Sequence, residues 1–245
     1  MSRYLEPLDR EAEEAAGSAS ESHRAPTDGP VGRLGPNEAP SIYGSLRERL
    51  LVAANGSPLR TLVFGGCEGR EGSTSVIRDF AEMLASAGPS VLLVDADLRT
   101  SGLIQHAAAG AANLSEVVKE GAMPSPTPWG KGWLTVILSP SSKPDSELFF
   151  RSPEFASWLD AQRKRYDYVL FDTAPLLRFA DGALIGRMTD GVVIVVQAEA
   201  TRRDSLVRAR NQLQRAGVNV IGVVLNRARN PVPTVLRPYL LSYVD

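Results

Sequence analysis

Apolar and polar positions alternate along this chain in a way that predicts a repeated strand–helix order. Several short runs are almost wholly apolar, which is typical of strands buried on both faces of a sheet. We expect strands at 60–64, 91–97, 133–138, 166–172, 191–198 and 218–226. Between these runs, apolar residues recur three and four positions apart, the spacing of an amphipathic helix. We expect helices at 41–54, 75–88, 146–150, 153–165, 180–187 and 203–216.

This alternation predicts a doubly wound α/β domain, in which a mainly parallel sheet is flanked by helices, over residues 41–230. Residues 1–40 are rich in Glu, Ala, Ser, Gly and Pro. Such a segment buries too little apolar surface to offset the entropy lost on ordering, so it is expected to be a disordered tail. Residues 231–245 are expected to form a C-terminal tail.

A glycine-rich segment, GGCEGREGSTS, joins the first expected strand to the next helix. Glycines in this place predict a phosphate cradle, because the N–H groups of the loop and of the helix N-terminus point toward one anion. A phosphate loop usually reads G-x-x-x-x-G-K-[ST], but here Ser73 follows Gly72 and the segment contains no lysine. The segment therefore predicts a degenerate nucleotide site. Its expected binding residues are Gly69, Arg70, Gly72, Ser73, Thr74, Ser75 and, from the last strand, Asn226.

Acidic side chains collect at the carboxyl ends of other strands, where open parallel sheets bind their ligands. Asp95 and Asp97 follow one strand, and Asp172 ends another. A single aspartate in such a place is often only a helix cap, but paired carboxylates beside a phosphate pocket suit Mg²⁺. We expect Asp95, Asp97 and Asp172 to be catalytic residues, or vestiges of them. Mg²⁺, if a nucleotide binds, is expected at Thr74, Asp95 and Asp172.

Composition narrows the function classes. The chain has 245 residues, 43% of them hydrophobic, which is enough for one full core. A formal net charge of -1 gives no general attraction to nucleic acid or to membranes. Cys67 is the only cysteine, so an internal disulfide is excluded, and the neighbouring Glu68 is expected to raise its pKa. An acidic N-terminus and the lack of a run of ~20 apolar residues predict a soluble, cytoplasmic protein.

The chain resembles the cytoplasmic domain of bacterial tyrosine kinases in four segments: VLLVDADLR, PDSELFFRSPEFASWLDAQRKRYDYVLFDTAP, DGVVIVVQAEATRRDSL and VIGVVLN. These kinases belong to the MinD/ParA-like P-loop class and act with membrane polysaccharide co-polymerases in capsule and exopolysaccharide export. The resemblance implies ATP or ADP with Mg²⁺ as cofactor, weakly bound or absent here. It implies a membrane co-polymerase or an active kinase as partner, and no nucleic acid. The chain would then be cytoplasmic, and peripheral at the inner membrane only through that partner.

Several positions depart from the family pattern. Ser73 stands in the place of the lysine, Arg70 in that of a glycine, and Glu68 in that of the second lysine of MinD-type loops. Loss of one preorganised cation lowers rates on the order of 10²–10³-fold, so impaired catalysis is expected. Arg70 folding back as a surrogate cation is the alternative. The family's E-x-x-R-x-x-R oligomerisation motif keeps only Arg47, which leaves a homo-oligomer open.

Two further features lie away from the loop. The tyrosine cluster of the family is reduced to Tyr239 and Tyr243, which are expected to be packing anchors rather than phosphorylation sites. The helix at 203–216 is basic, and it is either a solvated face or a contact for acidic lipid headgroups or an acidic partner segment. Its arginines are expected on the outer side: Arg202, Arg203, Arg208, Arg210 and Arg215.

Three functions follow from these observations. The first is a catalytically impaired, kinase-like regulator of bacterial polysaccharide synthesis and export. The second is an active but atypical tyrosine autokinase or ATPase of the same pathway. The third is a MinD/ParA-like positioning protein.

Overall fold

In a computed structural model of the chain, the structure describes residues 59–100, 103, 112–121, 123–140 and 144–228, together with positions 46 and 48. The expected tails and most of the expected helix at 41–54 lie outside these residues. So do Arg47, Tyr239 and Tyr243. Leu46 is helical and buried, in agreement with a helix before the first strand.

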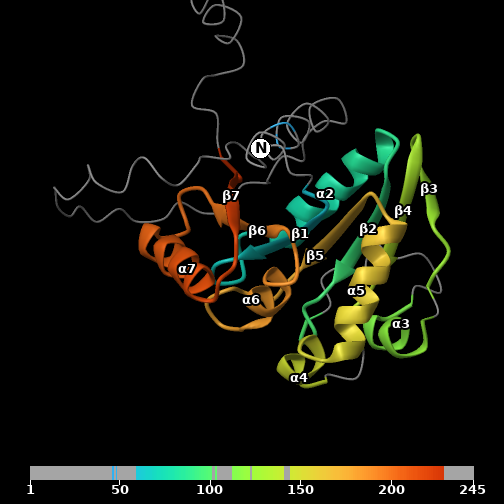
Figure 1. The fold of residues 1–245 in the computed structure, drawn as a ribbon. Coiled ribbons are helices and arrows are strands. Elements are labelled where there is room, and N and C mark those ends of the chain that lie inside the picture. Colours follow the sequence, from blue (N-terminus) through green and yellow to red (C-terminus); the bar gives the residue numbers. More distant parts are fainter. Residues whose placement is uncertain are drawn as a thin grey trace, which may run out of the picture.

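Seven strands form one sheet in the order β3-β4-β2-β5-β1-β6-β7 (Figure 1). They are β1 Thr61–Gly66, β2 Ser90–Asp95, β3 Thr127–Trp129, β4 Gly132–Ile137, β5 Tyr168–Asp172, β6 Gly191–Gln197 and β7 Val220–Asn226. Every neighbouring pair is parallel except β3 with β4. The mainly parallel sheet expected from the sequence is confirmed. Its strand order reverses beside β1, and ligands of such sheets bind at this kind of switch point.

Six helices connect the strands of the described chain. They are α2 Ser73–Ser86, α3 Leu114–Glu120, α4 Ser146–Phe150, α5 Pro153–Arg165, α6 Asp181–Gly186 and α7 Arg203–Arg215. α5 begins as expected at Pro153, because the hydroxyl of Ser152 accepts the N–H of Phe155 at 3.2 Å and caps the helix. The sequence did not indicate α3 or β3. No helix among the described residues is both long enough and apolar enough to cross a bilayer.

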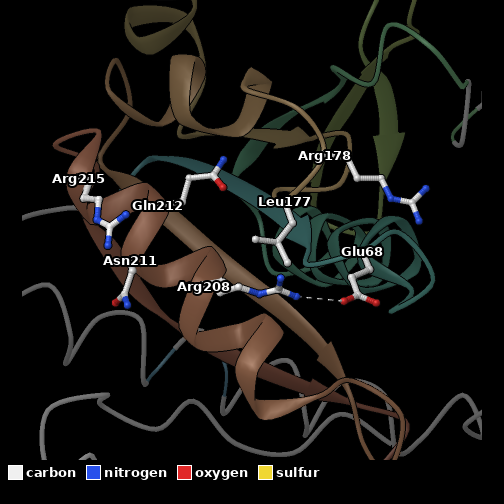
Figure 2. A pocket seen from close by; sticks show the side chains of 7 residues that line it. All are labelled: Glu68, Leu177, Arg178, Arg208, Asn211, Gln212 and Arg215. Carbon is white, nitrogen blue, oxygen red and sulfur yellow. Dashed lines mark ion pairs between the residues drawn. The ribbon is translucent and has the colours of Figure 1, made fainter.

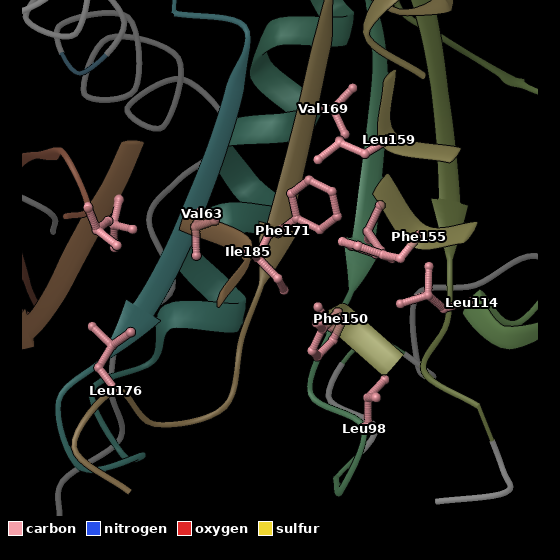
Figure 3. Close-up of a cluster of buried hydrophobic side chains, with 14 of the residues drawn as sticks. Val63, Leu98, Leu114, Phe150, Phe155, Leu159, Val169, Phe171, Leu176 and Ile185 are labelled. Atoms are coloured by element: carbon pink, nitrogen blue, oxygen red, sulfur yellow. The ribbon is translucent and has the colours of Figure 1, made fainter. Parts of the chain in front are cut away.

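Two buried clusters lie on opposite faces of the sheet. Alternate residues of β1 enter different clusters, Val63 one of them and Phe64 the other, because successive strand side chains point to opposite faces. α2 covers the Phe64 face, and α5, α6 and α7 contribute to the Val63 face (Figure 1). On that second face Phe150 meets Phe155 edge to face, with ring centroids 5.1 Å apart (Figure 3). This contact fixes the short α4 against α5 and so places its first residue, Ser146.

Candidate functional site

The glycine-rich loop lies between β1 and α2, at the carboxyl end of the central strand. Gly72 is the residue before the helix and has a φ of 79°, and Gly69 has a φ of 109°. Side chains other than glycine rarely adopt these backbone conformations. The N–H of Val76 donates to the carbonyl of Gly72 at 3.1 Å and closes the first helical turn. The glycines therefore turn the loop so that its N–H groups face inward.

The cradle formed by these N–H groups is filled by a side chain of the loop itself. The carboxylate of Glu71 accepts the N–H groups of Glu68, Gly69 and Arg70 at 2.8, 2.7 and 2.8 Å. Glu71 is only 5% exposed. A set of converging N–H groups is an anion-binding nest, and the anion that it holds here is an internal carboxylate.

Neighbouring residues keep Glu71 in this position. A side chain on Gly66 would come within 2.5 Å of its carboxylate oxygen, so the close approach needs a glycine. The carboxamide of Asn226, at the end of β7, donates to the carbonyl of Glu71 at 2.8 Å. Asn226 thus ties the loop to the sheet but does not line the pocket beside the loop.

Glu68 points to a different partner. The hydroxyl of Ser205 on α7 donates to its carboxylate at 2.6 Å, and a guanidinium nitrogen of Arg208 lies 4.0 Å away. The side chain that stands in the place of a family lysine therefore turns toward α7. Because Glu68 also lines the pocket, its negative charge still faces the space that an anionic ligand would enter.

The acidic strand ends meet as the sequence predicts. Asp95 and Asp172 are register partners on β2 and β5. Asp95 accepts the N–H groups of Asp97 and Leu103, each at 3.2 Å, and Asp97 accepts the N–H of Arg99 at 3.1 Å. These carboxylates therefore hold the chain after β2 in shape, which is the structural role that isolated aspartates often have.

Asp172 is buried, as Asp95 is, but its oxygen Oδ1 has no hydrogen-bond partner among the described residues. Burial raises its pKa to about 8, hydrogen bonds from Thr74 and Ser73 oppose that shift, and the charges of Asp95 and Asp97 reinforce it. The carboxyl group is therefore largely neutral at pH 7, and a cation bound beside it would favour its ionised form.

Arg99 is part of the pocket wall rather than a free cation. Its guanidinium pairs with the buried carboxylate of Asp181 at the start of α6 and donates to the hydroxyl of Ser146 at 2.6 Å. It also lies over the ring of Phe179, 3.8 Å from the ring centroid. These contacts join the segment after β2 to α4 and α6 and neutralise the charge of Arg99.

The pocket beside the loop has a volume of about 370 Å³. Five of the residues expected from the sequence line it: Gly69, Ser73, Thr74, Asp97 and Asp172. Five others do not line it: Arg70, Gly72, Ser75, Asp95 and Asn226. Arg70 is exposed, so the sequence-based alternative of a surrogate cation at this residue has no support from its position. Sequence reasoning missed Arg178, which lines the pocket and follows β5 with no motif to mark it.

The residues present fit a nucleotide only in part. No group of three or more His, Cys, Asp or Glu side chains among the described residues could hold a metal ion by itself. Mg²⁺ commonly binds with one or two carboxylates and takes further ligands from phosphates, and Thr74 and Asp172 suit that arrangement. The phosphate cradle does not fit as it stands, because the Glu71 carboxylate already accepts its N–H groups.

Cys67 gives a direct test of how tightly this loop is closed. Burial raises the pKa of its thiol to about 12, and the charges of Glu71 and Glu68 add to the shift. We expect Cys67 not to react with a maleimide in the folded chain at about pH 8, where an ordinary thiol with a pKa of ~8.5 reacts readily. Labelling followed by mass spectrometry along a urea series checks this, and it should reach one label per chain only on unfolding. Fast labelling without urea would show that the loop opens.

No protein-family model matches the chain. The chain is 27% identical to the tyrosine-protein kinase CpsD of Streptococcus agalactiae over 199 residues, which are 76% of this chain and 83% of that protein. It is 31% identical to EpsB of Ralstonia solanacearum over 200 residues, which are only 26% of that longer protein. Among solved structures, the kinase domain of the Escherichia coli tyrosine kinase ETK matches with a TM-score of 0.67 and 26% identity, covering 79% of each chain.

Proposed function

Because this chain is homologous to the bacterial tyrosine kinases and shares their P-loop fold, we propose that it is a catalytically impaired relative of them. It acts as a cytoplasmic accessory or regulator of capsule or exopolysaccharide synthesis and export, the pathway that the family resemblance implies. Its partner is a membrane polysaccharide co-polymerase or an active kinase, and that partner brings it to the inner membrane.

The filled cradle is the observation that carries the proposed impairment. The three N–H groups that would bind a phosphate already donate to Glu71, and Ser73 stands where a lysine would supply positive charge. A phosphate group must displace the carboxylate before it gains these donors. We therefore propose that ATP or ADP with Mg²⁺ binds weakly or not at all.

If a nucleotide does bind, the chain can still hold its metal. Thr74 and Asp172 line the pocket, so these two residues would hold Mg²⁺, whereas Asp95, beside Asp172 on the neighbouring strand β2, does not line the pocket. The ion would stabilise negative charge on a phosphoryl oxygen. Asp172 would have to lose its proton, because its pKa of about 8 leaves the carboxyl group mostly neutral at pH 7.

An active, atypical tyrosine autokinase or ATPase is the second candidate. The observation in its favour is Arg178, which lines the pocket and whose guanidinium group has no hydrogen bond or ion pair within the described part of the chain. Its charge could replace that of the missing lysine.

A MinD/ParA-like positioning protein is the third candidate and rests on the fold class alone.

Autophosphorylation separates these candidates. We expect the purified chain, given ATP and Mg²⁺, to form no phosphotyrosine at Tyr239 or Tyr243, because the cradle and the missing lysine leave the phosphates unsupported. Mass spectrometry of the intact chain and of its peptides checks this. Phosphotyrosine that disappears in Asp97→Asn would establish the active enzyme instead. Phosphate that appears only after an active kinase is added would make the chain a substrate and regulatory partner.

A further inference from the structure

A groove of about 660 Å³ runs between α7 and the turn that follows β5 (Figure 2). The turn contributes Leu177 and Arg178, and the glycine-rich loop contributes Glu68. α7 contributes the rest of the lining: Arg208, Asn211, Gln212 and Arg215. Three guanidinium groups therefore line the groove with one carboxylate, which makes it positively charged.

Most of this positive charge is unpaired. Within the described part of the chain, the guanidinium groups of Arg178 and Arg215 have no hydrogen bond or ion pair. Arg208 lies 3.3 Å from the hydroxyl oxygen of Ser205 and 4.0 Å from a carboxylate oxygen of Glu68. That oxygen already accepts the hydroxyl of Ser205 at 2.6 Å, so Glu68 engages Arg208 only at long range. The guanidinium groups of the groove therefore have N–H donors available to bind a ligand.

The walls of the groove are tied together. The carboxamide of Gln212 donates to the carbonyl of Leu176 at 3.0 Å, which joins α7 to the turn. The N–H groups of Leu176 and Leu177 donate to the carbonyls of Gly66 and Cys67 at 2.9 and 3.1 Å, which joins the turn to the loop. A groove held in this way loses little conformational entropy when it binds a ligand.

We propose that this groove binds an acidic segment of a partner protein. Guanidinium groups bind carboxylates through paired hydrogen bonds, the carboxamide of Asn211 suits a peptide bond, and Leu177 offers an apolar contact. None of the described residues that line the groove is aromatic, so no side chain among them could stack on a base, which argues against nucleic acid. Its concave shape and the carboxylate of Glu68 in its wall argue against a flat anionic membrane.

The inference extends the proposed function, because it gives the partner a docking surface and a chemistry. It rests on that function only in requiring that the chain acts through a partner. Nucleotide binding and peptide binding are measured separately, so either result can fail without the other.

A fluorescein-labelled synthetic peptide, in which glutamates alternate with leucine and glycine, tests the groove by fluorescence anisotropy with the full chain. We expect saturable binding that falls about tenfold or more when Arg208→Glu and Arg215→Glu are combined, because charge-assisted contacts are lost. The matched control combines Arg203→Glu and Lys164→Glu, two exposed residues outside the groove. It makes the same change in net charge and should alter affinity less than about twofold.

Three results would overturn the proposal: no binding by the unchanged chain, equal losses in the two charge-reversed variants, or undiminished binding of a peptide with glutamine in place of glutamate. Binding to vesicles that contain phosphatidylglycerol is measured in parallel, to test whether the groove binds an anionic membrane. If the groove variant loses vesicle binding but keeps peptide binding, the groove is a lipid site instead. Circular dichroism checks folding, and Arg208→Gln with Arg215→Gln replaces the reversed pair if that pair unfolds.

Discussion

Glu71→Gln is expected to weaken the fold and, at the same time, to strengthen the binding of phosphate-bearing ligands. The Glu71 carboxylate is buried and accepts three N–H groups of its own loop. A carboxamide has one acceptor oxygen and no charge, so we expect the free energy of unfolding to fall by about 2–3 kcal/mol. Because the cradle then holds a weaker internal ligand, the affinity for Mg²⁺–ATP should rise about tenfold or more. Urea denaturation and calorimetric titration measure the two effects.

Glu68→Gln is the matched control for this change. It removes the same charge from the same loop. The Glu68 side chain lines the pocket, but within the described part of the chain it accepts no N–H of the cradle. An equal gain in affinity from both variants would mean that charge repulsion, rather than the filled cradle, limits binding. Unchanged stability in Glu71→Gln would mean that the bonds to the cradle do not form in solution.

Restoring the missing lysine should raise nucleotide affinity more when the cradle is also emptied than when Glu71 still fills it. Ser73→Lys combined with Arg70→Gly puts a cation at the residue that lines the pocket and leaves the net charge unchanged. On its own, this double change should improve Mg²⁺–ATP binding by less than about tenfold, since Glu71 still occupies the N–H groups. Added to Glu71→Gln, it should give a gain in affinity larger than the product of the two separate gains, so that the free energies are not additive. Calorimetry on the set of variants measures this coupling.

Ser75→Lys in place of Ser73→Lys is the control, because Ser75 is exposed and does not line the pocket. It should leave the affinity almost unchanged. Strictly additive free energies would mean that the lysine and the cradle act independently. No gain from any combination would mean that the loop is closed by contacts other than Glu71.

The central sheet could be predicted because its signals are local. An unbroken apolar run such as 191–198 places apolar side chains on both faces of a strand. Such a strand buries all of them only when both faces of its sheet are covered. The acidic ends of β2 and β5 could be placed together for the same reason, since parallel strands end at one edge. β3 was missed because it has three residues, includes Pro128 and lies at the edge of the sheet, where it pairs only with β4. α3 has seven residues, which is too short for a clear helical period.

The contacts that decide the chemistry could not be predicted, because they depend on side-chain direction and on residues distant in sequence. The amino-acid sequence of the loop does not show that the Glu71 side chain is buried while the Arg70 side chain is exposed to solvent. Arg178 reaches the pocket only through the fold. The expectation that Arg210 lies outside was wrong: it is half-buried, and its Nε is buried with no hydrogen bond among the described residues. The 3.6-residue period of a helix predicts on which face a side chain lies, but it does not predict which other residues cover that face.

Glu68 and Arg178 line both the pocket beside the loop and the groove along α7. A ligand that moves these side chains in the pocket also changes the shape and charge of the groove, and the reverse holds as well. Binding in the pocket and binding in the groove are therefore thermodynamically linked. Linkage is reciprocal: if an acidic segment in the groove weakened nucleotide binding by some factor, nucleotide would weaken the hold on that segment by the same factor. A chain that never completes a phosphoryl transfer could then still report the local ATP concentration, by releasing or keeping its partner.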